Sequence, residues 1–241
     1  MSQTISIRSD ERFASCLPYV GERLARSKID VKLAPLECLI ERRTKALQEH
    51  LISALSEVIV VDCKAHFIES NLKLPIQNKL HKHAFIRALC EFDYETDKMI
   101  ASALLQLGDE FLLHSFYDFC TDKLKTRWQE AITLANDNLP HLLCGQNFCE
   151  LLRFLVSTIE NRTHEAFIVK RGACVEVLDR NMRPFEGVYV NLTLPEDIRI
   201  IETLVALSPR KIFNLTGSKD LQETIETIFG NCEEKASTML S

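Results

Sequence analysis

The chain has few glycines and no glycine-rich loop. Its 241 residues contain only seven glycines, and these are spread singly along the sequence. A P-loop and a dinucleotide-binding fingerprint each need several glycines close together, because the backbone must approach the phosphates. The Gly-x-Ser-x-Gly elbow of serine hydrolases is missing as well. We therefore expect no nucleotide cofactor, and none of the common hydrolase motifs is present.

The sequence also lacks paired cysteines. Its nine cysteines are scattered and never form Cys-x-x-Cys, so neither a disulfide framework nor a zinc ribbon is indicated. The densest cluster, His141, Cys144 and Cys149, is one ligand short of a structural zinc site. Most of the thiols lie in apolar periodic segments, which is typical of free cysteines in a reducing compartment. These patterns predict a cytoplasmic protein without a metal.

No apolar run approaches the ~20 residues that a membrane-spanning helix requires, and Met1–Asp10 lacks the build of a signal peptide. We expect no membrane segment and no export. The formal net charge is −5 and the pI is near 5.8, so a nucleic-acid partner is disfavoured. Hydrophobic residues make up 46% and charged residues 26% of the chain, which is the composition of an ordinary globular protein.

Residues 1–65 are predicted to form a small βαβαβ unit. Apolar residues that alternate indicate strands, and apolar residues three or four apart indicate helices. The branched run Val58–Cys63 is long enough for a buried strand and too short for a helix. The expected elements are a strand at Thr4–Arg8, a helix through Phe13, Leu17 and Leu24, a strand at Ile29–Leu33, a helix from Leu36 through Leu55 and a strand at Val58–Cys63.

Residues 66–162 are predicted to form a helical block. Its expected helices are Ile76–Phe92, Tyr94–Leu107, a long helix from Asp109 through Ile132, and Phe148–Ile159.

Residues 163–231 are predicted to form a β-meander followed by a helix, a strand and a helix. The meander strands are Glu165–Lys170, Cys174–Leu178 and Val188–Leu192; a helix from Pro195 through Leu207, a strand at Lys211–Leu215 and a helix at Asp220–Phe229 follow. Residues 232–241 are expected to be a flexible tail. No Pro-, Gly- or Ser-rich linker separates the three blocks, so the sequence predicts an α+β protein packed as one domain.

Four stretches carry a family resemblance: Phe119–Ile132 and Phe148–Val156 on helices, Val177–Asn181 in the meander, and Leu207–Phe213. In this order they resemble the YtxC-like family of spore-forming bacteria, and the likeness extends over residues 56–230. The turn Asp179–Arg183 departs from the family pattern, which has a glycine there. The resemblance implies a cytosolic, sporulation-linked protein without an assigned activity, and it carries over no functional residues.

Two kinds of candidate site remain. A nucleophilic site needs a thiol beside a base and an orienting group, and Asp62, Cys63 and His66 are the best candidates for it. A buried cysteine that follows a strand-end aspartate is the simpler interpretation. Basic residues gather in two stretches that are candidates for a binding patch, although such runs are usually solvated surface. The first stretch contains Lys73, Lys79 and Lys82. The second is formed by Arg180, Arg183, Arg210 and Lys211 if the hairpin turn lies near the last strand.

Two functional hypotheses follow. The first is a non-enzymatic interaction or regulatory protein with a protein partner, which predicts a surface patch. The second is an enzyme or nucleic-acid-binding module of an unrecognised kind that uses Asp62, Cys63 and His66 or the basic stretches. The oligomeric state is left open by the sequence.

Overall fold

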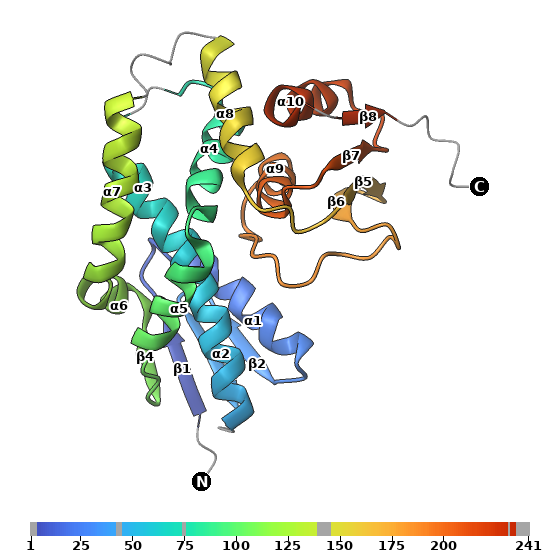
Figure 1. The fold of residues 1–241 in the computed structure, drawn as a ribbon. Coiled ribbons are helices and arrows are strands. Elements are labelled where there is room, and N and C mark those ends of the chain that lie inside the picture. The colour runs from blue at the N-terminus through green and yellow to red at the C-terminus, as the bar shows by residue number, and fades with distance from the viewer. Residues whose placement is uncertain (1–3, 42–44, 74–75, 139–145, 231, 235–241) are drawn as a thin grey trace. The chain divides into compact units, whose positions relative to one another are not determined.

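The computed structural model describes residues 4–41, 45–73, 76–138, 146–230 and 232–234, and these residues form an α+β fold, as the sequence predicts (Figure 1). The chain divides into two compact units. Unit 1 comprises Met1–Leu72, Asp93–Thr133 and Asn191–Thr193, and unit 2 comprises Lys73–Phe92, Leu134–Val190 and Leu194–Ser241. Because the chain passes between the units several times, the helical block expected at 66–162 contributes to both.

Unit 1 is built on a four-stranded sheet, sheet A. Its strands are β1 (Thr4–Arg8), β2 (Val31–Ala34), β3 (Glu37–Glu41) and β4 (Glu110–Leu112), in the order β2-β3-β1-β4. Strand β3 pairs antiparallel with β1 and β2, and β4 pairs parallel with β1. Side chains alternate between the faces. Apolar residues such as Ile5 and Ile40 are fully buried on one face, while the other face carries the Arg8 ion pairs with Glu37 and Glu110.

Helices cover the apolar face of sheet A, and α1 contacts both β2 and β3. A π-helical segment, Ile59–Cys63, joins α2 to α3, so these helices run as one continuous stretch (Figure 1). The helices with all or most of their length in unit 1 are α1 (Leu17–Arg26), α2 (Lys45–Val58), α3 (Lys64–Asn71), α5 (Tyr94–Leu104), α6 (Leu113–Cys120) and α7 (Asp122–Asn138).

Two predictions for this unit are wrong. The run Val58–Cys63 is helical instead of extended. The helix predicted from Leu36 begins only at Lys45, as α2, and Glu37–Glu41 before it form the strand β3 instead. A short apolar run suits a buried helix as well as a buried strand, and here Ile59, Val60 and Val61 are all buried. The third strand of the unit is therefore β3, where Cys38 and Ile40 face the core.

The long helix predicted from Asp109 is interrupted. Residues Glu110–Leu112 form β4, and the helical part is split into α6 and α7 at Thr121. The strand forms because Phe111 aligns with Ile7 of β1, so its side chain joins the buried face. At the split, the Thr121 hydroxyl donates a hydrogen bond to the Tyr117 carbonyl, and such back-bonding bends helices.

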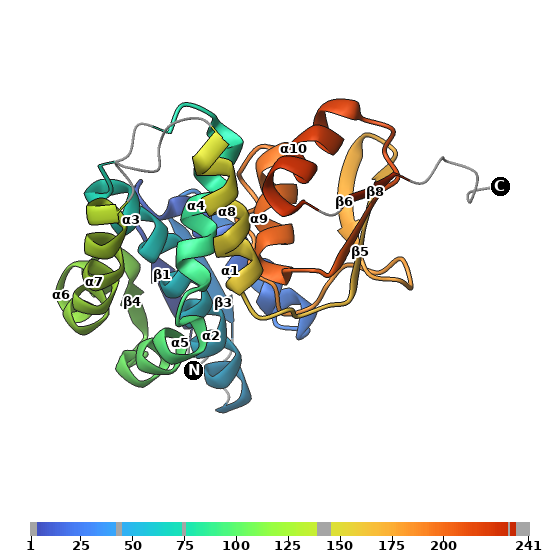
Figure 2. The same ribbon diagram turned by 45° about the horizontal axis from the view of Figure 1, so that its top comes forward.

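Unit 2 contains sheet B, with strand order β6-β5-β7-β8. Strands β5 and β6 form a hairpin, and β5, β7 and β8 run parallel, connected through α9 and α10. Figure 2 shows α4, α8, α9 and α10 on one side of this sheet. The bounds are α4 (Lys79–Glu91), α8 (Gln146–Thr158), β5 (Glu165–Arg171), β6 (Cys174–Leu178), α9 (Glu196–Leu207), β7 (Lys211–Asn214), α10 (Lys219–Phe229) and β8 (Cys232–Glu234).

The hairpin and the order α9-β7-α10 are confirmed, but two details of the C-terminal prediction are wrong. The segment Val188–Leu192 is not a strand; it belongs to an irregular connection in which Tyr189 is 1% exposed. The alternation of apolar residues in this segment therefore does not indicate a strand; the segment is a loop with a buried side chain. Residues Cys232–Glu234 were expected in the tail and instead extend sheet B as β8, parallel to β7.

Candidate functional site

The turn after β6 is held by one aspartate. Asp179 Oδ1 accepts hydrogen bonds from the backbone amides of Asn181 and Arg183, both at 2.8 Å. These bonds favour the charged carboxylate, so they lower the pKa of Asp179. Met182 takes a left-handed φ of 59°, and its carbonyl accepts a hydrogen bond from Arg171 Nη2 at 2.8 Å. The backbone of this five-residue turn is thereby fixed without a glycine.

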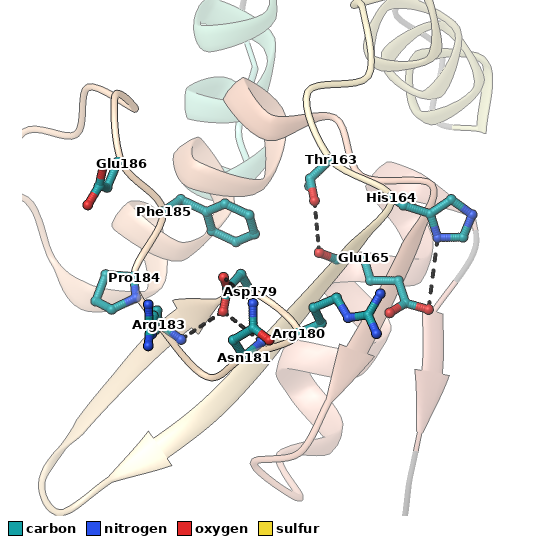
Figure 3. A pocket seen from close by; sticks show the side chains of 10 residues that line it. All are labelled: Thr163, His164, Glu165, Asp179, Arg180, Asn181, Arg183, Pro184, Phe185 and Glu186. Atoms are coloured by element: carbon teal, nitrogen blue, oxygen red, sulfur yellow. Dashed lines mark hydrogen bonds and ion pairs between the residues drawn. The ribbon is translucent and has the colours of Figure 1, made fainter.

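A pocket of about 730 Å³ lies between this turn and the start of β5. We call it the turn pocket. Figure 3 shows the Phe185 ring turned toward Asp179, while the Arg180 side chain extends toward Glu165. The residues that line the pocket are Thr163, His164, Glu165, Asp179, Arg180, Asn181, Arg183, Pro184, Phe185 and Glu186.

The charged groups of the turn pocket differ in what they already bind. Asp179 is engaged by the backbone of its own turn. His164 Nδ1 lies 3.9 Å from Glu165 Oε1, on the β5 side of the pocket. Arg180 and Arg183 are exposed, and both belong to the turn that Asp179 fixes. Guanidinium groups presented on an ordered backbone suit the recognition of carboxylates, because less freedom is lost when they bind.

The structure brings together one group of the predicted patch residues. Lys211 is the neighbour of Glu165 in the parallel register of β7 and β5, and its amide donates a hydrogen bond to the His164 carbonyl. The preceding residue, Arg210, is exposed. The start of β7 therefore lies beside the turn pocket, which places Arg210 and Lys211 at the same end of sheet B as Arg180 and Arg183.

The remaining patch residues occupy a different element. Lys79 and Lys82 lie in the first turns of α4, and Lys73 precedes that helix. The Lys73 amide donates to Asn136 Oδ1 at 3.1 Å. None of these three lysines lines the turn pocket, so the structure offers no reason to join the two basic stretches into one patch.

Asp62, Cys63 and His66 lie on the continuous helix α2–α3. Cys63 is fully buried, and burial raises the pKa of its thiol well above the usual value. Asp62 Oδ2 is 2.8 Å from Cys16 Sγ, from which it accepts a hydrogen bond, and the His66 ring packs edge-on against Phe13. A thiol that resists ionisation is a poor nucleophile, so this arrangement favours a packing role for Cys63.

Alkylation rates test this interpretation. Cys120 and Cys174 are exposed, whereas Cys16 and Cys63 are buried. With iodoacetamide at neutral pH, the buried pair should react at least roughly a thousandfold more slowly, because reaction waits for an opening that costs on the order of 5 kcal/mol. Mass spectrometry of tryptic peptides at successive times gives the rates. If Cys63 reacts as fast as Cys120, its thiol is accessible and the catalytic hypothesis regains support.

Sequence reasoning missed the acidic and aromatic residues of the turn pocket. The spacing of Asp179 and Asn181 is an Asx-turn pattern that would have indicated an ordered turn. Nothing in the sequence linked the turn to His164 and Glu165, because that proximity arises from the hairpin and from the pairing of β5 with β7.

Within the described ranges, no group of three His, Cys, Asp or Glu side chains is placed to hold a metal ion; His141 and Cys144 lie outside those ranges. Likewise, no helix among the described residues has both the length and the apolar character to cross a membrane. Comparisons of the chain with protein-family models, with curated proteins and with solved structures found no match.

Proposed function

We propose that this protein is a non-enzymatic interaction protein that binds an acidic segment of a partner protein at the turn pocket of unit 2. The observation that carries the proposal is the presentation of Arg180 and Arg183 on a turn whose backbone is fixed by Asp179. Both arginines line the pocket. Two exposed guanidinium groups on an ordered turn are suited to bind carboxylates, because each planar guanidinium group can form two parallel hydrogen bonds with a carboxylate.

The local charge balance supports an acidic ligand. Four basic residues, Arg180, Arg183, Arg210 and Lys211, lie at this end of sheet B. The acidic residues of the pocket are Glu165, Asp179 and Glu186, and the Asp179 carboxylate already accepts two backbone amides. Within the lining itself, Arg180 and Arg183 face Glu165 and Glu186 as well as Asp179. The excess of positive charge at this end of sheet B therefore comes from Arg210 and Lys211, even though the chain as a whole carries −5.

The resemblance of residues 56–230 to the YtxC-like family supports a place for this interaction in spore development. Among the described residues, buried cysteines such as Cys38 and Cys63 form no disulfide, and this supports a cytoplasmic setting, where thiols stay reduced. In this proposal the partner is a cytosolic protein with a cluster of glutamate or aspartate residues.

Binding of an acidic peptide tests the proposal. A fluorescein-labelled hexaglutamate peptide, followed by fluorescence anisotropy near physiological salt, should bind the wild-type protein. The double substitution Arg180→Ala/Arg183→Ala should weaken this binding roughly tenfold, since each exposed ion pair contributes about 0.2–1 kcal/mol and two are removed. The Arg183 charge contributes to the lowered pKa of Asp179, but the bonds that hold the turn come from backbone amides and from Arg171. The variant should therefore unfold nearly like the wild type.

The matched control is Lys170→Ala. Lys170 is exposed in the same strand as Glu165, close to the other end of β5, so its loss changes the net charge without touching the pocket. Equal weakening by Lys170→Ala would mean that binding depends on overall charge and would contradict the proposal. Tighter binding of a single-stranded oligonucleotide, with the same dependence on the two arginines, would favour the nucleic-acid alternative instead.

A further inference from the structure

Strand β2 leaves one edge of sheet A open. The sheet order places β2 at the end of the sheet. The Glu41 amide donates to the Asp30 carbonyl, and Asp30 precedes the register pair Val31 and Ile40. In an antiparallel ladder, hydrogen-bonded and non-hydrogen-bonded pairs alternate. The backbone groups of Lys32 therefore bond to β3. The backbone N–H and C=O groups of Val31 and Leu33 point in the opposite direction, outward from the edge of the sheet.

A groove of about 650 Å³ runs along this open edge, between α1 and β2. Val31 and Leu33 line it from the strand, and Gly21 lines it from α1. A Cβ at Gly21 would lie 3.0 Å from Leu33 Cδ1, so the missing side chain lets strand and helix approach closely. Leu33 is 52% and Leu192 38% exposed. The open edge is thus bordered by apolar surface on the side of α1.

The edge of sheet B formed by β6 differs from the open edge at β2, because a side chain occupies one of its outward backbone amides. Arg171 and Cys174 are the pair that closes the hairpin, and Val175 of β6 is the next residue along the strand. Because hydrogen-bonded and non-hydrogen-bonded pairs alternate, the Val175 amide points away from β5, toward the outer edge. Glu196 Oε1 from α9 accepts a hydrogen bond from that amide at 2.8 Å. A side chain that occupies an edge donor protects the strand from pairing with another chain. Among the described residues, β2 has no comparable bond at Val31 or Leu33.

We propose that a second copy of this chain adds to sheet A at β2, antiparallel and with Val31 opposite Val31 of the second copy. This register places Lys32 of each chain opposite Asp30 of the other chain, and the two-fold symmetry gives two such pairs. Lys32 also pairs with Glu41 of its own chain at 2.5 Å, so Asp30 of the second copy adds a second carboxylate to the same ammonium group. Opposite charges directly across an antiparallel pair are stabilising. The same two-fold arrangement brings the exposed apolar residues beside the two grooves together. The inference is independent of the turn pocket, which lies in unit 2.

Charge favours this register over the neighbouring one centred on Lys32, and it favours a second copy of the chain as the occupant. Moving the two-fold axis by one residue, to Lys32, would set two like charges against each other and would be unfavourable. A lysine on an edge strand normally discourages pairing, but here Asp30 stands two residues before it and supplies the opposite charge. The strand is therefore complementary to itself when the axis passes through Val31, and isologous pairing of this kind gives a closed dimer.

Sedimentation equilibrium over a range of concentrations tests the proposal on the full chain. The wild type should show a monomer–dimer equilibrium. Lys32→Asp should raise the dimer dissociation constant by about tenfold, because two attractive pairs become repulsive. The charge swap Asp30→Lys/Lys32→Asp should restore the wild-type constant. Val31→Pro should abolish the dimer, because it removes an outward amide that β3 does not use.

A cross-linking experiment examines the register directly. In a Cys120→Ser/Cys174→Ser background, Val31→Cys should form a disulfide dimer on mild oxidation, since the α-carbons of such a hydrogen-bonded pair lie about 5.5 Å apart. Lys32→Cys should not. A wild type that stays monomeric at the highest concentration would overturn the proposal, even if an extended peptide of another protein bound at β2. A dimer unaffected by both Lys32→Asp and Val31→Pro would overturn it as well.

Discussion

Replacing Asp97 with alanine is expected to lower the free energy of unfolding of unit 1 by about 3–5 kcal/mol, because it leaves the buried Lys64 ammonium group without the Asp97 carboxylate. The Asp97 side chain is 1% exposed and pairs with Lys64, which is 3% exposed, at 2.9 Å. The same Asp97 oxygen accepts a hydrogen bond from Trp128 Nε1 at 2.9 Å, and the other accepts one from Arg127 Nε at 3.0 Å. One carboxylate thus joins α3, α5 and α7.

Guanidinium denaturation followed by the fluorescence of Trp128, the single tryptophan of the chain, measures this effect within unit 1. Glu110→Ala is the matched control, because it also removes a carboxylate from an ion pair, but one whose partners, Arg8 and Glu110, are about half exposed. An exposed pair contributes at most about 1 kcal/mol. The expectation fails if Asp97→Ala costs no more than Glu110→Ala.

Part of the Asp97 effect belongs to the ammonium that is left behind. The double variant Lys64→Met/Asp97→Asn should therefore lose less stability than Lys64→Met and Asp97→Asn lose in sum when each is made alone. When both charges are removed together, no buried charge is left without its partner. Strictly additive losses would mean that Lys64 and Asp97 act separately, and the large effect would then have to come from the bonds to Trp128 and Arg127.

Secondary-structure elements could be predicted from the sequence where the pattern of apolar and turn-forming residues fits only one kind of element. The helix α9 is apolar nearly all round and begins after Pro195, and the hairpin β5–β6 has a two-residue turn at Gly172, where φ is 61°. The sequence was insufficient where a pattern suits two structures. Val58–Cys63 is an apolar run that periodicity cannot assign to a strand or a helix. In the structure it is helical, and its apolar side chains are buried.

The candidate sites show the same limit at longer range. The basic residues near Arg180 and near Lys211 were visible in the sequence, but their meeting depends on the pairing of β7 with β5, which no local pattern encodes. Asp62 and Cys63 stood out because they are adjacent to each other and close to His66. Burial then raised the pKa of the Cys63 thiol, and burial of a particular side chain is a property of packing that sequence spacing does not specify.

Unit 2 has its own buried ion pair, and Glu91→Ala is expected to destabilise that unit by about 3–5 kcal/mol. Glu91 Oε1 lies 2.7 Å from Arg87 Nη2, and both side chains are at most 2% exposed. The other oxygen, Oε2, is 2.8 Å from Arg162 Nη2. The carboxylate therefore ties α4 to the segment that leads into β5, and its removal leaves the Arg87 guanidinium buried without this counterion.

Because Trp128 belongs to unit 1, the Glu91 effect is best measured by hydrogen exchange of the α4 and α9 amides, which should lose protection together. Glu176→Ala is the control in the same unit, since the Arg171–Glu176 pair is more than 40% exposed on both sides and should matter little. Replacing both partners, as Arg87→Met/Glu91→Leu, should restore much of the lost protection, because neither position then carries a buried charge. Protection as low in this double variant as in Glu91→Ala would show that the carboxylate stabilises unit 2 chiefly through Arg162.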